Sequence, residues 1–261
     1  MGCLSHDGVD DGYELTTLAS ALANVSDGAW TVGALVKFAD LGHFSGIAYL
    51  LTGAGAGTTE AGLSNSSTTN GPIVDVNSGF TFPGTVDLTS TANPYMLVCS
   101  KGAGAVAPRI GIKLGVGGSW VHADSDAGGT LIDQVAAVQL QIGMWEEGDF
   151  FEGHLGVIAF WEGAMSDGNK EALDDNWRTS DWWLSAHGQP EFLMEFNVAA
   201  ASVVDLAGNA SSLTVIGAPT LDAGETLNSW NFDGTGIAVT PAVDIDVTDH
   251  PKYLMAGRST V

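Results

Sequence analysis

Short apolar runs bounded by Gly, Pro, Asn or Asp recur along most of this chain. Runs of this length and spacing are typical of β-strands joined by turns. The 35 glycines supply turn residues, and a hydrophobic share of 45% is enough for one large core. The sequence therefore predicts an all-β fold. The expected strands are Trp30–Lys37, Gly46–Leu51, Ile73–Val76, Tyr95–Cys99, Arg109–Leu114, Ser119–His122, Val135–Gly143 and His154–Trp161.

Other segments carry different signals. Ser166 can cap a short helix that continues to Trp177, and we expect this helix to plug one open end of the fold. The stretch from Gly53 to Gly71 is rich in Gly, Ala, Ser and Thr, which predicts a mobile loop. The tail after Gln189 and Pro190 again predicts strands, at Glu191–Val198, Ser212–Ile216, Thr226–Phe232 and, as an edge strand or arm, Val243–Val247.

The charge balance limits the partners of the chain. Its 31 Asp and Glu residues against 8 Lys and Arg give a formal net charge of −23. Such a surface repels phosphate backbones, so nucleic acid and anionic membranes are poor partners, whereas neutral glycans, divalent cations and basic protein patches remain open. Dense carboxylates also suit a high-salt medium, which stays a side interpretation.

The start of the chain shows neither a basic segment followed by an apolar run nor a myristoylation signal, because His6 stands where Ser or Thr is needed. No apolar stretch is long enough for a bilayer span. We therefore expect a product made in a host cytoplasm without a signal peptide. Cys3 and Cys99 can form one bridge at most, and two free buried thiols are the favoured state.

Three motifs resemble the laminin G-like, concanavalin A-like jelly-roll family. They are the opening turn Asp7–Tyr13, the strand Trp30–Val36, and Phe151–Ser166, which in the family precedes a short helix. A fourth element, Asp205–Asn209 with Leu213–Pro219, comes first in many members and last here. The resemblance implies an antiparallel two-sheet jelly-roll sandwich with circularly permuted motif order and one short helix. Surface termini that lie close together permit such an order.

The resemblance divides the chain into a sandwich over residues 1–235 and a C-terminal edge strand or arm over 236–261. The motif order is also similar to minor tail or capsid decoration proteins of phages that infect actinobacteria. That similarity implies a virion location, other virion proteins as partners, and a trimer or other homo-oligomer by analogy.

Catalytic patterns are weak. Glucanases with this type of sandwich carry Glu-x-Asp-x-Glu on one strand, and the nearest match here, Val243–Asp249, lacks the Glu pair. Glu146, Glu147, Asp149 and Glu152 cluster beside Trp145, but a hairpin with solvated carboxylates explains them better. We therefore expect a protein that is not an enzyme, with a secreted glucanase-like enzyme as the last alternative.

Calcium is the cofactor with the best motivation. Asp7, Asp10 and Asp11 place carboxylates on one tight turn, and the permuted order brings Asp205 and Asn209 from the other end of the chain. The alternative is that these side chains only accept hydrogen bonds from the backbone of their turns.

Aromatic side chains next to polar ones suggest a glycan surface. Candidates are Trp120 with His122 and Asp124, and the pair Trp182 and Trp183. Core packing is the commoner role of tryptophan in a sandwich, and solitary histidines are more often structural. The leading hypothesis is a non-enzymatic virion protein that presents a lectin-like surface to host cell-surface polysaccharide. The alternative is a structural virion protein that contacts only other subunits.

Overall fold

The computed structural model describes residues 3–52, 59–66, 71–75, 80–82, 86–115, 118–125, 136–145, 148–176, 187–195, 205–209 and 213–222. The chain divides into two units, Met1–Trp230 and Asn231–Val261, and all of the described residues belong to the first. The predicted arm over 236–261 lies outside them.

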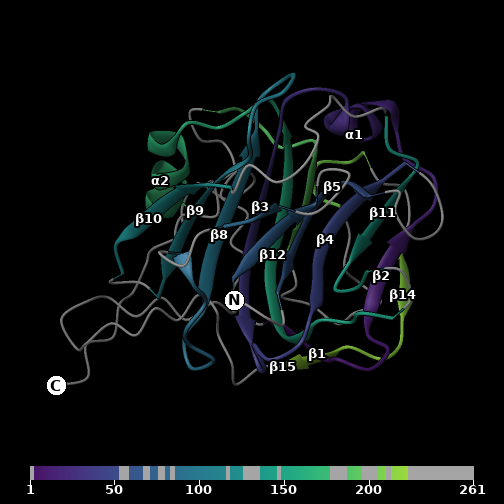
Figure 1. The fold of residues 1–261 in the computed structure, drawn as a ribbon. Helices are drawn as coiled ribbons and strands as arrows, with labels where there is room; N and C mark the ends of the chain where they lie inside the picture. Colours follow the sequence, from purple (N-terminus) through teal and green to yellow (C-terminus); the bar gives the residue numbers. More distant parts are fainter. Residues whose placement is uncertain are drawn as a thin grey trace, which may run out of the picture. The chain divides into compact units, whose positions relative to one another are not determined.

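Two antiparallel sheets, here called sheet A and sheet B, form the first unit (Figure 1). Sheet A consists of β1 (Cys3–Asp7), β3 (Trp30–Phe38), β8 (Tyr95–Lys101), β9 (Arg109–Leu114), β10 (Trp120–Asp124), β12 (Glu152–Glu162), β13 (Phe192–Glu195) and β15 (Thr220–Asp222). Sheet B consists of β2 (Gly12–Leu15), β4 (Ser45–Leu51), β5 (Thr59–Asn65), β6 (Pro72–Asp75), β7 (Phe80–Thr81), β11 (Gln139–Ile142) and β14 (Thr214–Ile216).

The strand order confirms the predicted all-β, two-sheet jelly-roll sandwich. Sheet A runs β10-β9-β8-β3-β12-β1-β15, with β13 also paired to β12, and sheet B runs β14-β2-β11-β4-β5-β6-β7. Neighbours in each order are often far apart in sequence, as crossing connections between two sheets require.

The two ends of the first unit complete each other in both sheets. In sheet A, β1 pairs with β15 through Leu4 and Leu221, and in sheet B, β2 pairs with β14 through Tyr13 and Val215. Strand β13 adds to β12 as well. The prediction that the beginning and the tail form one β core is therefore confirmed.

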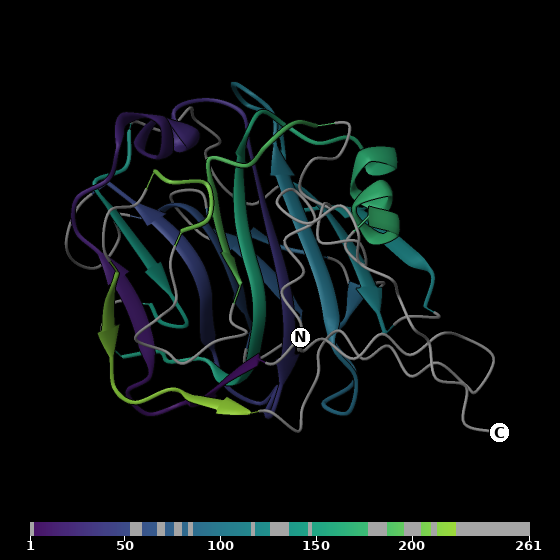
Figure 2. The same cartoon turned by 180° about the vertical axis from the view of Figure 1, so that it is seen from behind.

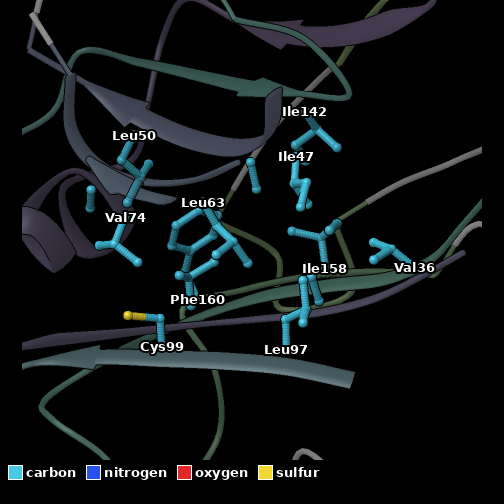
Figure 3. Close-up of a cluster of buried hydrophobic side chains, with 14 of the residues drawn as sticks. Val36, Ile47, Leu50, Leu63, Val74, Leu97, Cys99, Ile142, Ile158 and Phe160 are labelled. Carbon is cyan, nitrogen blue, oxygen red and sulfur yellow. The ribbon is translucent and has the colours of Figure 1, made fainter. Parts of the chain in front are cut away.

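The main core lies between the sheets, where alternate residues of both layers point inward (Figure 3). Gln139 and Gln141 face away from this core while Leu140 and Ile142 face into it, which is the alternation that the sequence predicted. Cys3 and Cys99 are buried free thiols, as expected. Labelled core residues in Figure 3 are Val36, Ile47, Leu50, Leu63, Val74, Leu97, Cys99, Ile142, Ile158 and Phe160.

A second apolar cluster covers the outer face of sheet A. The indole ring of Trp161 lies over Gly33, where an added Cβ would be 3.0 Å from the ring. The other members include Leu35, Met96, Val98, Val157, Met165 and Leu173. Both faces of β3 are therefore buried, which explains why its sequence is a nearly continuous apolar run.

Among the described residues there are three short helical segments: α1 (Ser20–Ala23), the 3₁₀ helix η1 (Asn24–Ser26) and α2 (Asp167–Asn176). The sequence predicted α2, and the hydroxyl of Ser166 caps it by accepting the N–H of Asn169 at 3.3 Å. Its expected position in an open end of the sandwich is corrected, because Leu173 packs α2 into the outer cluster of sheet A (Figure 2). α1 was not predicted.

One predicted loop is wrong in part. Strand β5 lies inside the stretch Gly53–Gly71, and its residues Ala61 and Leu63 reach the core between the sheets. Gly62 faces outward under the ring of Tyr49. Gly62, one of the small residues that suggested a loop, lets the large ring of Tyr49 lie on the sheet. No helix in the described part of the chain has the length and apolar character that a membrane crossing requires.

Candidate binding surface on strand β10

Strand β10 is the last strand at one edge of sheet A, and it carries three of the predicted glycan-binding residues. Trp120, His122 and Asp124 alternate along the strand, so they share its outward face. The side chain of Trp120 is half-buried against the outer apolar cluster, while that of Asp124 is 68% exposed. The strand therefore presents an aromatic side chain at one end of this face and an exposed carboxylate at the other.

His122 occupies the middle of this face. Its imidazole ring is nearly parallel to the indole of Trp120, with an interplanar angle of 10° and ring centroids 5.9 Å apart. The ring lies on Gly111 of β9, where an added Cβ would approach it to 2.9 Å. Both ring nitrogens of His122 lie close to carboxylates of helix α2. Its Nε2 is 3.0 Å from Oε1 of Glu171, and its Nδ1 is 3.3 Å from Oδ1 of Asp167.

Arg109 of β9 connects strand β10 to helix α2. Its Nε and Nη2 both donate to the carboxylate of Asp167, the shortest bond being 2.6 Å, and Nη1 donates to Asp124 at 2.9 Å. The two carboxylates raise the pKa of Arg109, and the guanidinium holds the pKa of Asp167 below its usual value. A bidentate arginine–carboxylate pair fixes orientation as well as distance.

Lys170 anchors the helix from below. Its side chain is completely buried and its Nζ donates to the carbonyl oxygen of Arg109 at 2.8 Å. Burial lowers the pKa of Lys170, and the nearby carboxylate of Asp167 acts in the opposite direction. Contacts from strand β9 and helix α2 thus hold the polar groups around Trp120 in place.

The turn that leads into α2 is tied to sheet A by hydroxyl groups. The hydroxyl of Thr31 donates to the carbonyl of Gly163 at 2.8 Å and accepts the N–H of Met165 at 3.0 Å. The hydroxyl of Ser100 lies 2.9 Å from that of Thr31. These contacts set where the first turn of the helix begins, and so where Asp167 meets Arg109.

Sequence reasoning missed Arg109, Asp167 and Glu171. The only available signal was that Asp167 and Glu171 are four residues apart on a predicted helix and so share one face. The other two predicted glycan residues, Trp182 and Trp183, lie outside the described residues.

The predicted calcium residues occupy two places. One carboxylate oxygen each from Asp7, Asp10 and Asp11 lies within 4.8 Å of the others. Asp11 also accepts the N–H of Asp7 at 3.0 Å, and Asp7 accepts the N–H of Val9 at 2.8 Å. The carboxylates of Asp7 and Asp11 thus accept hydrogen bonds from backbone N–H groups of the turn. Calcium binding stays a prediction.

Asp205 and Asn209 organise a different turn, beside β13. Asp205 accepts the N–H groups of Leu193 and Asn209, at 2.9 and 2.7 Å. The amide of Asn209 donates to the carbonyl of Glu191 at 2.9 Å. In the described part of the chain, Asp205 does not belong to the carboxylate group of the first turn.

The acidic cluster near Trp145 is described in part, since Glu146 and Glu147 lie outside the described residues. Burial raises the pKa of Asp149. Its carbonyl oxygen accepts the N–H of Gly46 at 3.1 Å and that of Trp145 at 3.2 Å, so this segment is a tight connection between β11 and β12.

Comparisons with known proteins give similarity in structure only. No family model matches the chain, and no curated protein matches it in sequence. One similar structure is the sialidase of Trypanosoma rangeli, with a TM-score of 0.44 and 12% identity over 58% of this chain and 23% of that one.

Two further structures cover more of their own length. The CBM40 module of the Ruminococcus gnavus IT-sialidase, bound to α2,3-sialyllactose, has a TM-score of 0.42 and 11% identity over 67% of this chain and 96% of that one. A Bacteroides ovatus protein described as carbohydrate-binding has a TM-score of 0.47 and 14% identity, over 85% and 63%. The chain thus spans about a quarter of the sialidase and less than two thirds of the B. ovatus protein.

Proposed function

We propose that this chain is a non-enzymatic, lectin-like module of a bacteriophage virion, and that the outward face of β10 binds host cell-surface glycan. The observation that carries the proposal is the half-buried indole of Trp120, which lies among polar groups already held in fixed positions. Binding a sugar at such a surface costs little ordering of side chains.

The chemistry of this surface suits a neutral sugar. The apolar side of a pyranose ring packs on an indole, and its hydroxyls bond to carboxylates and to N–H donors. Asp124 and Glu171, whose side chains are 68% and 52% exposed, keep acceptor oxygens open to solvent. The guanidinium of Arg109, which is 39% exposed, provides donors beside them.

The carboxylate of Asp167 lacks the property that a general acid needs. A general acid for glycoside cleavage must keep its proton near neutral pH, which requires a raised pKa. The pKa of Asp167 is instead lowered, because Arg109 donates two hydrogen bonds to it. Asp167 therefore stays ionised near neutral pH, which does not suit a general acid.

A glycan array of host wall polysaccharides tests this binding surface. We expect Trp120→Ala to weaken binding by about tenfold or more, as loss of a buried aromatic contact does. Trp120→Phe, which keeps an aromatic ring against the outer cluster, separates lost binding from lost folding. Val121→Thr is the matched control, because this exposed residue sits on the same strand and points to the other face.

Unchanged binding by a folded Trp120→Ala protein would remove β10 as the glycan surface. Turnover of laminarin or a related glucan by the parent protein would overturn the non-enzymatic part of the proposal.

The virion context has its own test. Antibody labelling of assembled particles is expected to place the chain at a tail tip or fibre. Labelling that follows the capsid lattice would favour the alternative of a purely structural subunit, and absence from particles would overturn both.

A further inference from the structure

The turn between β3 and β4 meets the start of β12 where β3 ends, at the pair of Phe38 and Gly153. There Asp40, His43 and Glu152 each offer one ligand atom, and all three atoms lie within 4.8 Å of one another. We infer that this chain binds a divalent transition-metal ion, with zinc as the probe, through these three side chains. The inference is independent of the glycan surface on β10.

Backbone contacts bring the two segments together. Phe38, the last residue of β3, pairs with Gly153, and the N–H of Ala39 donates to the carbonyl oxygen of Glu152 at 3.0 Å. Glu152 therefore starts its strand directly beside the turn that carries Asp40 and His43.

The donor atoms are at separations that suit one ion. Oδ1 of Asp40 accepts the N–H of Gly42 at 2.7 Å, which leaves Oδ2 turned toward His43. Oδ2 lies 3.2 Å from Nδ1 of His43. Two donors that each sit about 2.0–2.2 Å from a single zinc ion are roughly 3–3.5 Å apart. The carboxylate of Glu152 lies within 4.8 Å of both donors.

Neighbouring strands hold the donors in place. Asn65 of β5, fully buried, donates through Nδ2 to the carbonyl oxygens of His43 and Leu41, at 3.2 and 3.4 Å. Gly8 packs on the stem of Glu152, where an added Cβ would come within 2.9 Å, and its φ of +77° suits glycine. A site assembled before the ion arrives binds it with less loss of conformational freedom.

The donor set selects the kind of ion. One imidazole nitrogen with two carboxylates suits zinc and similar metals, whereas calcium takes six to eight oxygens. Two carboxylates with a neutral imidazole carry a net negative charge, which a divalent cation offsets. Without an ion, the carboxylate of Glu152 would lie within 4.8 Å of that of Asp40, and two negative charges this close repel each other. Three protein ligands also leave coordination positions for water or a ligand oxygen.

Zinc titration of the full-length chain by calorimetry, after removal of metals with a chelator, tests the inference. We expect one saturable site, and about a tenfold or greater loss of affinity in His43→Gln and in Glu152→Gln. The matched control is His122→Gln, which removes a histidine that also lies between two carboxylates, Asp167 and Glu171. Far-ultraviolet circular dichroism confirms that each variant is folded.

Cobalt gives an independent readout, because its visible absorption reports coordination directly. A band that appears with the parent and with His122→Gln, but not with His43→Gln, supports the assignment. The absence of a saturable zinc site, equal affinity in His43→Gln and the parent, or calcium that displaces zinc at equal concentration would overturn it.

Discussion

The carboxylate of Asp11 accepts the backbone N–H of Ala218 at 2.7 Å, across 207 positions of the chain. Its second oxygen accepts the N–H of Asp7 at 3.0 Å. Asp11 is only 4% exposed, and burial raises its pKa against the effect of these two bonds. One side chain thus joins the turn between β1 and β2 to the turn between β14 and β15.

Asp11→Asn should therefore destabilise the fold by about 1–3 kcal/mol, because an amide has one acceptor oxygen and would set its NH₂ against a buried N–H. Urea unfolding measures the change. Asp10→Asn, at an exposed position of the same turn, is the control and should cost less than about 0.5 kcal/mol. Equal midpoints for Asp11→Asn and the parent would show that the bond to Ala218 contributes nothing.

His6 makes stability depend on pH. It is buried between Tyr13 and Phe151, and burial lowers its pKa to about 4. The unfolded chain, with an imidazole pKa of about 6.5, binds this proton first as the pH falls. Stability from this group is complete above about pH 6.5 and is lost progressively toward pH 4, by up to about 3 kcal/mol.

His6→Phe keeps an aromatic ring in this slot and removes the proton-binding group. Unfolding free energies measured from pH 7 to pH 4 should fall less steeply in the variant than in the parent. Parallel curves would mean that His6 is protonated equally in both states.

Two glycines should respond to alanine in opposite directions. An alanine at Gly62 would place its Cβ 2.0 Å from the ring of Tyr49, which is fully buried, so we expect a loss of about 1–3 kcal/mol or more. Gly168 of α2 has no atom within 4 Å of an added Cβ, and alanine there should stabilise by up to about 1 kcal/mol. Thermal unfolding of both variants shows whether each one is more or less stable than the parent. Unchanged stability of Gly62→Ala would mean that the ring of Tyr49 can move off the sheet.

The two thiols should be unreactive in the native state. Cys3 and Cys99 are fully buried, and burial raises the pKa of Cys99 to about 12, so almost no thiolate forms near neutral pH. A thiol reagent is expected to label both residues only after denaturation. Rapid labelling of Cys99 in the folded chain would contradict its place in the core.

Local sequence patterns predicted much of the fold. The capped helix at Ser166, the alternation around Leu140 and Ile142, and the pairing of the first two strands with β14 and β15 were predicted and are observed. Strand β5 was not predicted because Gly62 looks like a loop residue in the sequence. Its small size is needed only because the ring of Tyr49, on the neighbouring strand β4, lies over it. The place of α2 was wrong because the outer cluster that receives Leu173 comes from separate strands.

The amino-acid sequence by itself determined the strand-rich class, the capped helix and the acidic surface, because these follow from spacing and composition within short windows of chain. Tertiary structure alone decided which polar side chains meet. Arg109 reaches Asp167 over 58 positions, and Glu152 lies beside Asp40 through strand pairing. Such contacts depend on sheet register and on the packing of one element against another, and neither is encoded in any single segment.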